Sequence, residues 1–219
     1  MSIYKEIIKP NHLCFDIGAN NGNKTQEMLD CGAKVIAIEP QTTCFSKLKE
    51  KFENNQNVIL INKSVSFENG IGEIYLSNAH TVSTMSLEFI NKTQEKRFSG
   101  IKWEKTEQVI TITLDEIIKL HGIPDFCKID VEGFEYNVLL GLTKKIKILS
   151  IEFTPELKKN SFECIKLLNN IGNYKFNYSE GENGVFLFED WLTSDDMISF
   201  LEKNNDYVYS FGDIYSKIF

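Results

Sequence analysis

Two acidic residues near the N-terminus each follow an apolar segment, and a glycine-rich turn comes directly after the first. Asp16 belongs to the sequence Phe-Asp-Ile-Gly-Ala-Asn-Asn-Gly at residues 15–22, and Glu39 ends a second apolar run. In an open α/β sheet, strand ends of this kind build a pocket for a nucleoside. The glycines, Gly18 and Gly22, are not spaced as in the Gly-x-Gly-x-x-Gly pattern that approaches a pyrophosphate. The pattern therefore predicts a nucleoside ligand without a diphosphate.

S-adenosylmethionine (SAM) is the commonest ligand of that kind, and the chain offers partners for its polar groups. Asp16 is placed to bind the ammonium group of SAM, and Glu39 to accept hydrogen bonds from both ribose hydroxyls. Glycines in the turn would let the backbone approach the methionine part of the ligand. The remaining candidate contacts are Gly18, Asn20, Gly22 and Thr25. An NAD-dependent oxidoreductase would share Glu39, but it requires a third glycine in the region that Lys24 occupies.

A third group of acidic residues follows an apolar run in the second half of the chain. The sequence Lys-Ile-Asp-Val-Glu-Gly-Phe-Glu at 128–135 places Asp130, Glu132 and Glu135 at the end of the fourth core strand. In a doubly wound sheet that strand lies beside the first, so a carboxylate there faces the reacting end of the ligand. Burial of like charges is costly, and we therefore expect a cation or an acceptor hydroxyl nearby. Lys128 is expected to neutralise the acids.

Alternating strands and helices are expected to position these residues. Strands are predicted at 12–17, 35–38, 58–65, 71–76, 109–112, 124–131 and 146–153, and helices at 20–30, 42–53, 114–122, 134–142, 155–169 and 194–203. This order predicts a doubly wound α/β fold with a mostly parallel sheet and helices on both faces. Residues 174–178 and 185–188 are expected to form a hairpin, and hence an antiparallel pair at the sheet edge.

The whole chain, residues 1–219, is expected to form one domain, because no segment has the composition of an interdomain linker. Residues 79–108 interrupt the alternation with a polar segment rich in Ser, Thr and Lys. Long excursions of this kind often act as lids or as walls of a substrate site. We expect one of these roles for residues 79–108.

Charge, cysteine content and hydropathy indicate the cellular compartment of the protein and the classes of partner it can bind. The net charge of −7 disfavours a protein that follows a nucleic-acid backbone. The five cysteines include no Cys-x-x-Cys pair and are expected to be free thiols in a reducing compartment. No signal peptide and no apolar run of membrane-spanning length is present, so we expect a soluble, cytoplasmic protein.

Taken together, these motifs resemble those of the FkbM family of SAM-dependent methyltransferases. The resemblance rests on the turn at 15–22, the strand that ends in Glu39 and Pro40, Thr-Leu-Asp at 113–115, and the block at 128–135. It spans most of the chain and implies the class I methyltransferase fold, whose seven-stranded sheet has an antiparallel last strand. It also implies methyl transfer to a hydroxyl of a small molecule or sugar. Residues at family cofactor positions are Asp16, Gly18, Asn20, Gly22 and Glu39, and Ser64 lies where class I enzymes contact the adenine.

Methyl transfer to a hydroxyl is an in-line displacement that needs an aligned acceptor, and a base or a metal can lower the pKa of that hydroxyl. Asp130, in the family's fourth-strand signature, is the first candidate for the base or the acceptor-orienting group. His80, near the start of the excursion, is the second candidate. Asp130, Glu132 and Glu152 could instead hold Mg²⁺ through oxygen ligands.

Other functions stay open at this point. A non-catalytic SAM-binding module would keep the glycine turn and Glu39 but would lack the acids near the methyl group. An N-methyltransferase would carry the same residues, and an NAD-dependent oxidoreductase is the least favoured alternative. Aromatic residues near the C-terminus could stack on a sugar or pack in a homodimer interface, namely Tyr207, Tyr209, Phe211, Tyr215 and Phe219.

Overall fold

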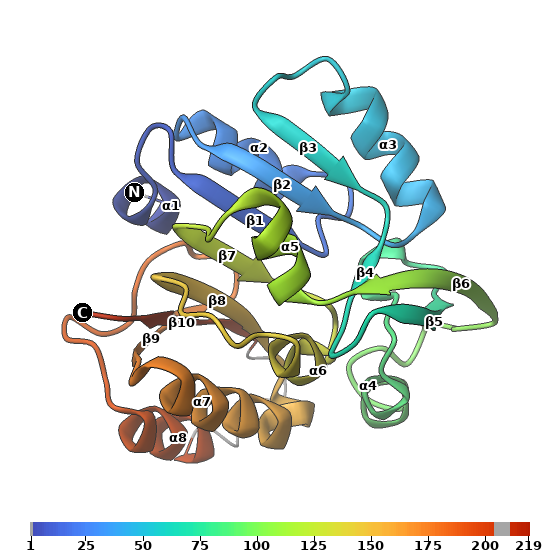
Figure 1. Ribbon diagram of the computed structural model, residues 1–219. Coiled ribbons are helices and arrows are strands. Elements are labelled where there is room, and N and C mark those ends of the chain that lie inside the picture. The colour runs from blue at the N-terminus through green and yellow to red at the C-terminus, as the bar shows by residue number, and fades with distance from the viewer. Residues whose placement is uncertain (1, 204–210) are drawn as a thin grey trace.

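Seven strands form the central sheet in the computed structural model, which describes residues 2–203 and 211–219 (Figure 1). Their order across the sheet is β3, β2, β1, β7, β8, β10 and β9. The strands are β1 (Leu13–Ile17), β2 (Lys34–Ile38), β3 (Val58–Ile61), β7 (Phe126–Ile129), β8 (Ile148–Phe153), β9 (Lys175–Glu180) and β10 (Gly212–Lys217). From β3 to β8 the neighbours are parallel, whereas β10 runs antiparallel to both β8 and β9. The sheet is therefore mostly parallel, as predicted, with an antiparallel last strand.

Helices cover both faces of this sheet, which explains why its inner strands are apolar throughout. One face packs against α1 (Ile3–Ile7), α2 (Asn23–Asp30) and α3 (Thr42–Phe52), and the other against α5 (Leu114–His121), α6 (Glu135–Leu140), α7 (Lys158–Gly172) and α8 (Ser194–Lys203). Successive strand residues alternate between the two cores, so Cys14 joins the first and Phe15 the second. This arrangement confirms the doubly wound α/β prediction.

A second, three-stranded sheet lies beyond the carboxyl ends of the parallel strands (Figure 1). It contains β4 (Ser64–Val65), β5 (Gly70–Leu76) and β6 (Lys105–Ile112), and the chain between β5 and β6 forms the short 3-10 helix η1 (His80–Val82) and α4 (Leu87–Thr93). The predicted strand at 58–65 is thus divided between two sheets. The division occurs beside Asn62, whose Nδ2 donates to the carbonyl groups of Glu39 and Pro40 and holds the chain where it leaves the main sheet.

The C-terminal antiparallel pair differs from the predicted hairpin. β9 pairs with β10, whereas residues 185–188 form no strand. Phe186 and Phe188 pack through their rings instead, with centroids 5.2 Å from Tyr215 and 4.9 Å from Phe200. Insertion of β10 between β8 and β9 buries its apolar residues, and this gain depends on distant strands that local sequence patterns do not reveal.

The C-terminal aromatic residues differ in how far they are buried. Tyr215 is 3% exposed and stacks on Phe126, so it is a core residue and is not available to a sugar. Phe219 is exposed beside Trp191, and Tyr207 and Tyr209 lie outside the described residues. The five cysteines are free. None of the helices in the described ranges has the length and apolar character needed to cross a membrane.

Candidate functional site

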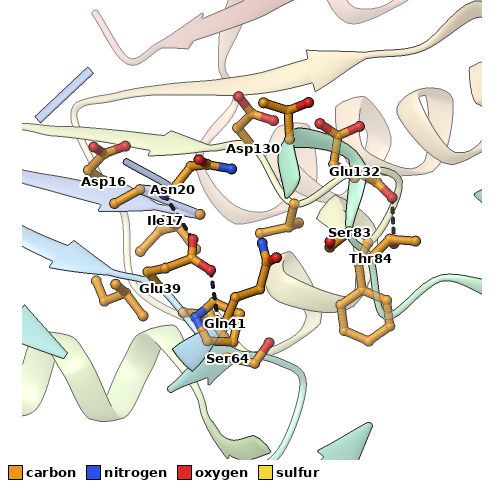
Figure 2. Close-up of a pocket in the computed structure, with 18 of the residues that line it drawn as sticks. Asp16, Ile17, Asn20, Glu39, Gln41, Ser64, Ser83, Thr84, Asp130 and Glu132 are labelled. Carbon is orange, nitrogen blue, oxygen red and sulfur yellow. Dashed lines mark hydrogen bonds between the residues drawn. The ribbon is translucent and has the colours of Figure 1, made fainter. Parts of the chain in front are cut away.

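A cavity of about 290 Å³ lies at the carboxyl ends of the parallel strands (Figure 2). The loops after β1 and β2 form one part of its wall, the loop after β7 and the end of β8 form another, and residues from η1 to Met85 complete it. The predicted site residues that line it are Asp16, Gly18, Asn20, Glu39, Ser64, His80, Asp130, Glu132 and Glu152. From β1 the sheet extends toward β2 and β3 on one side and toward β7 and β8 on the other. A cavity is expected where the strand order changes direction in this way.

The two glycines of the first turn serve different purposes. Gly18 has φ +80°, and a Cβ atom there would lie 1.9 Å from the carbonyl oxygen of Asp130. Gly18 therefore allows the turns after β1 and β7 to touch. Gly22 begins α2 with φ +77°, and a Cβ atom there would meet Phe52 and Leu48 of α3 at 2.4 and 2.7 Å. Gly22 is not among the residues that line the cavity, and its approach to the ligand stays a prediction.

Asp16 presents one free carboxylate oxygen to the cavity. The side chain is 1% exposed, and its Oδ2 accepts a 2.5 Å hydrogen bond from the Thr25 hydroxyl. Its Oδ1 is buried and has no hydrogen-bond partner in the part of the chain that the structure describes. Burial raises the pKa of Asp16, while Lys128 and the Thr25 hydroxyl oppose this rise. Thr25 lies behind Asp16 and orients it, so it does not itself line the cavity.

Glu39 is held by the backbone on both sides. Its Oε2 accepts from the amide of Asn20 and its Oε1 from the amide of Gln41, each at 2.8 Å (Figure 2). The side chain is 2% exposed, and burial raises its pKa to about 7 although both amides act to lower it. Gln41 is a cavity residue that the sequence analysis did not identify; the available signal was a polar residue just after the strand-end acid.

His80 connects the excursion to both loops near Glu39. Its carbonyl oxygen accepts from Asn20 Nδ2 at 3.2 Å and from Gln41 Nε2 at 3.1 Å, and its Nε2 lies 3.2 Å from Asn21 Nδ2. The structure thus places His80 against the first turn. Its hydrogen-bond partners come from the loops after β1 and β2, whereas the acids of the β7 turn lie along another side of the cavity.

Three carboxylates gather at that other side. Asp130, Glu132 and Glu152 each offer an oxygen atom, and these atoms all lie within 4.8 Å of one another. Glu132 has the left-handed φ of 55°, and its carbonyl oxygen accepts from the Thr84 hydroxyl at 2.7 Å (Figure 2). Glu135 turns away from this group, because its Oε1 accepts from the amides of Val131 and Gly133 and so holds the turn.

Lys128 is the cation at the centre of these acids. It is 3% exposed and forms a 2.5 Å ion pair with Asp130. Burial alone would lower its pKa, but Asp130, Asp213 and Asp16 together raise it, so Lys128 stays charged. Asp213 was not identified from the sequence, because its strand, β10, was not predicted. Burial raises the pKa of Glu152 well above its usual value, and repulsion from Glu132 and Asp130 adds to the rise.

Comparisons with known proteins agree with this architecture. A family described as the methyltransferase FkbM domain matches residues 16–209. Curated protein sequences gave no match. The crystal structure of precorrin-6y C5,15-methyltransferase from Geobacter metallireducens GS-15 has a TM-score of 0.51 and 10% identity, covering 99% of this chain and 85% of that chain. An rRNA methylase from Streptococcus thermophilus has a TM-score of 0.50 and 10% identity, covering 99% of this chain and 92% of that chain. At these identities the two structures support the fold alone.

Proposed function

The chain belongs to the FkbM methyltransferase family, and from this premise we propose that it transfers a methyl group from SAM to a hydroxyl oxygen of a small molecule or a sugar. The observation that carries the proposal is a division of charge within one cavity. Buried carboxylates of Asp16 and Glu39 lie on the side of the first two strands, and a second set, which includes Asp130, lies on the side of β7 and β8. One set suits the cofactor and the other suits an acceptor.

The chemistry of SAM fits the first set. Its ammonium group can donate to the free Oδ1 of Asp16, because an unpartnered buried carboxylate oxygen gains most from a charged donor. The ribose hydroxyls can donate to the remaining lone pairs of Glu39, whose orientation the amides of Asn20 and Gln41 set. Ser64, which lies below Glu39 and Gln41 in Figure 2, is assigned to the adenine.

The second set is assigned to the acceptor. When bound, SAM supplies a methyl group on a positively charged sulfur. We assign Asp130 to orienting the acceptor hydroxyl, because Lys128 already engages one of its two carboxylate oxygens. The hydroxyl proton passes to a neighbouring carboxylate of this set. His80 is assigned to holding the excursion against the loops after β1 and β2.

An amine is the second candidate acceptor. Three carboxylates whose oxygens lie within 4.8 Å of one another also suit a protonated amine, which would give N-methylation. A phosphate-rich acceptor is disfavoured at this end of the cavity, because the acids would repel it. The mass and fragmentation of the methylated product distinguish oxygen from nitrogen.

Calorimetric titration of the full chain with SAM, S-adenosylhomocysteine and NAD tests the cofactor assignment first. We expect saturable binding of both adenosyl ligands and none of NAD. A screen of hydroxylated and amino acceptors with radiolabelled SAM then tests the transfer. Binding of NAD alone, or of no ligand, would contradict the proposal, and SAM binding without transfer to any acceptor would favour a non-catalytic binding module.

A further inference from the structure

Two separate segments bring the three carboxylates of the β7 and β8 side together. Asp130 and Glu132 come from the turn after β7, and Glu152 comes from the parallel neighbour β8. Glu135 and Thr84 form hydrogen bonds to the backbone of that turn, and these bonds fix the backbone that carries Asp130 and Glu132. None of these three hydrogen bonds involves a carboxylate oxygen of Asp130, Glu132 or Glu152.

Glu152 gives an independent indication that this part of the cavity binds a ligand. Its Oε2 is buried against the cavity, and no described residue donates a hydrogen bond to it. Buried carboxylate oxygens without a donor are rare, because the lost hydration is not replaced. A proton or a cation must therefore accompany Glu152 when the cofactor site is empty.

The nearby positive charge does not meet this need. Lys128 pairs with Asp130, and it also faces the carboxylates of Asp16 and Asp213. Arg97 forms an ion pair with Glu156 at 3.3 Å, and its charge also acts to lower the pKa of Glu132. In the described part of the chain, neither Glu132 nor Glu152 forms an ion pair with a basic side chain, whereas Asp130 and Glu156 do.

We propose that Asp130, Glu132 and Glu152 bind a divalent cation such as Mg²⁺ or Mn²⁺. Carboxylate oxygens without sulfur or nitrogen ligands select hard cations of this class. Metal–oxygen distances of roughly 2.0–2.6 Å allow oxygens up to about 5 Å apart to share one ion, and the three oxygens here lie within 4.8 Å of one another. The role of the cation rests on the proposed function: beside the acceptor, it would lower the pKa of the hydroxyl that receives the methyl group.

Titration with Mn²⁺, followed by the electron paramagnetic resonance signal of the free ion, tests the site without an acceptor. The full chain is used with and without S-adenosylhomocysteine, and Mg²⁺ is added as a competitor. We expect one saturable site with sub-millimolar affinity that Mg²⁺ displaces. Glu152→Gln and Glu132→Gln should each weaken Mn²⁺ binding by about ten-fold or more, because each removes a charged ligand.

Glu182→Gln is the matched control. Glu182 also lines the cavity, but its side chain is 74% exposed and pairs with Lys24. The same loss of charge there should change Mn²⁺ affinity by less than about two-fold, since an exposed charge is screened. Thermal unfolding of each variant verifies that it is folded, and Glu132→Gln provides a second test if Glu152→Gln does not fold.

The outcomes separate this inference from the proposed function. Saturable binding that both glutamate variants lose and the control retains supports the cation site. No saturable Mn²⁺ binding, or equal binding by wild type and Glu152→Gln, overturns it and leaves a shared proton as the partner of Glu152. If S-adenosylhomocysteine still binds in that case, the proposed function stands and only the cation site fails. If neither ligand binds, both fail.

Discussion

At the residue scale, the site holds carboxylates where water is excluded. Glu39 is 2% exposed and Asp16 is 1% exposed, yet each is needed as a hydrogen-bond acceptor in the proposed cofactor site. Backbone amides and the Thr25 hydroxyl replace part of the lost hydration, but burial still raises the pKa of both acids. The empty site is therefore strained electrostatically, and a cationic ligand relieves the strain.

Glu39→Gln should weaken SAM binding and lower the stability of the protein without ligand. The amide lacks the charge that receives the ribose hydroxyls, so we expect the dissociation constant for SAM to rise by about ten-fold or more. The substitution also leaves either the Asn20 or the Gln41 amide facing the new NH2 group, so the melting temperature of the ligand-free protein should fall. Calorimetry and thermal unfolding measure the two effects. Glu50→Gln, at an exposed position of α3, should alter neither, and unchanged SAM affinity in Glu39→Gln would contradict the ribose assignment.

SAM affinity should depend on pH near neutrality. Burial raises the pKa of Glu39 to about 7, and the charge of Asp16 contributes to the rise. Only the ionised carboxylate receives both hydroxyls, so affinity should fall as pH drops below 7, by about ten-fold between pH 8 and pH 6. Titrations at the two pH values test this, with Glu39→Gln as the control that should lose most of the dependence. A flat profile in the wild type would contradict it.

At the element scale, close contact between two turns creates the cavity. Gly18 has φ +80° and lies against the Asp130 carbonyl, so the loop after β1 and the turn after β7 share one wall. The excursion completes the cavity through two hydrogen bonds. His80 accepts one from Asn20 in the loop after β1, and Thr84 donates one to Glu132 in the turn after β7. Parallel strands align the turns, but these short contacts decide the shape of the cavity.

Gly18→Ala should destabilise the fold and abolish SAM binding. The added Cβ would lie 1.9 Å from a backbone oxygen, and the positive φ is itself unfavourable for alanine. We expect a loss of about 2–3 kcal/mol in the free energy of unfolding, measured by chemical denaturation. Gly100→Ala is the control, because no atom lies within 4 Å of the Cβ position there. Equal stability of the two variants would show that the turns can separate at little cost.

The excursion should become more protected when the cofactor site is filled. His80 and Thr84 attach it to the two turns that contact the ligand, so a lid or wall at residues 79–86 should open less often with ligand bound. Hydrogen exchange with and without S-adenosylhomocysteine measures this, and helix α8 serves as a distant control. If exchange at residues 79–86 does not slow, the predicted role of the excursion as a lid is wrong.

At the scale of the whole molecule, stability and function oppose each other through the buried acids. Burial raises the pKa of Glu39 and Glu135 to about 7 and that of Asp213 to about 6, although Lys128 opposes the last shift. Each acid therefore binds its proton more tightly in the folded state than in the unfolded chain. Stability from this source is present at low pH and is lost as pH rises through the folded values.

The ligand-free protein should accordingly be more stable at pH 6 than at pH 8. The difference should be on the order of a few kcal/mol, because the three acids contribute in the same direction. Urea denaturation at the two pH values measures it, and saturating S-adenosylhomocysteine should reduce the difference if the ligand favours the ionised acids. Greater stability at pH 8 would show that the acids are better solvated than their burial indicates.

Local patterns in the sequence were sufficient for the fold class and for most of the cavity residues. Apolar runs that end in an acid, such as those before Asp16 and Glu39, mark strand ends, and parallel strands bring their carboxyl ends to one edge. Contacts between distant segments decided the rest. Gly22 faces α3, Thr25 supports Asp16, and Asp213 reaches Lys128 from a strand whose stability depends on β8 and β9. These roles follow from packing and electrostatic interactions between segments, which no local pattern encodes.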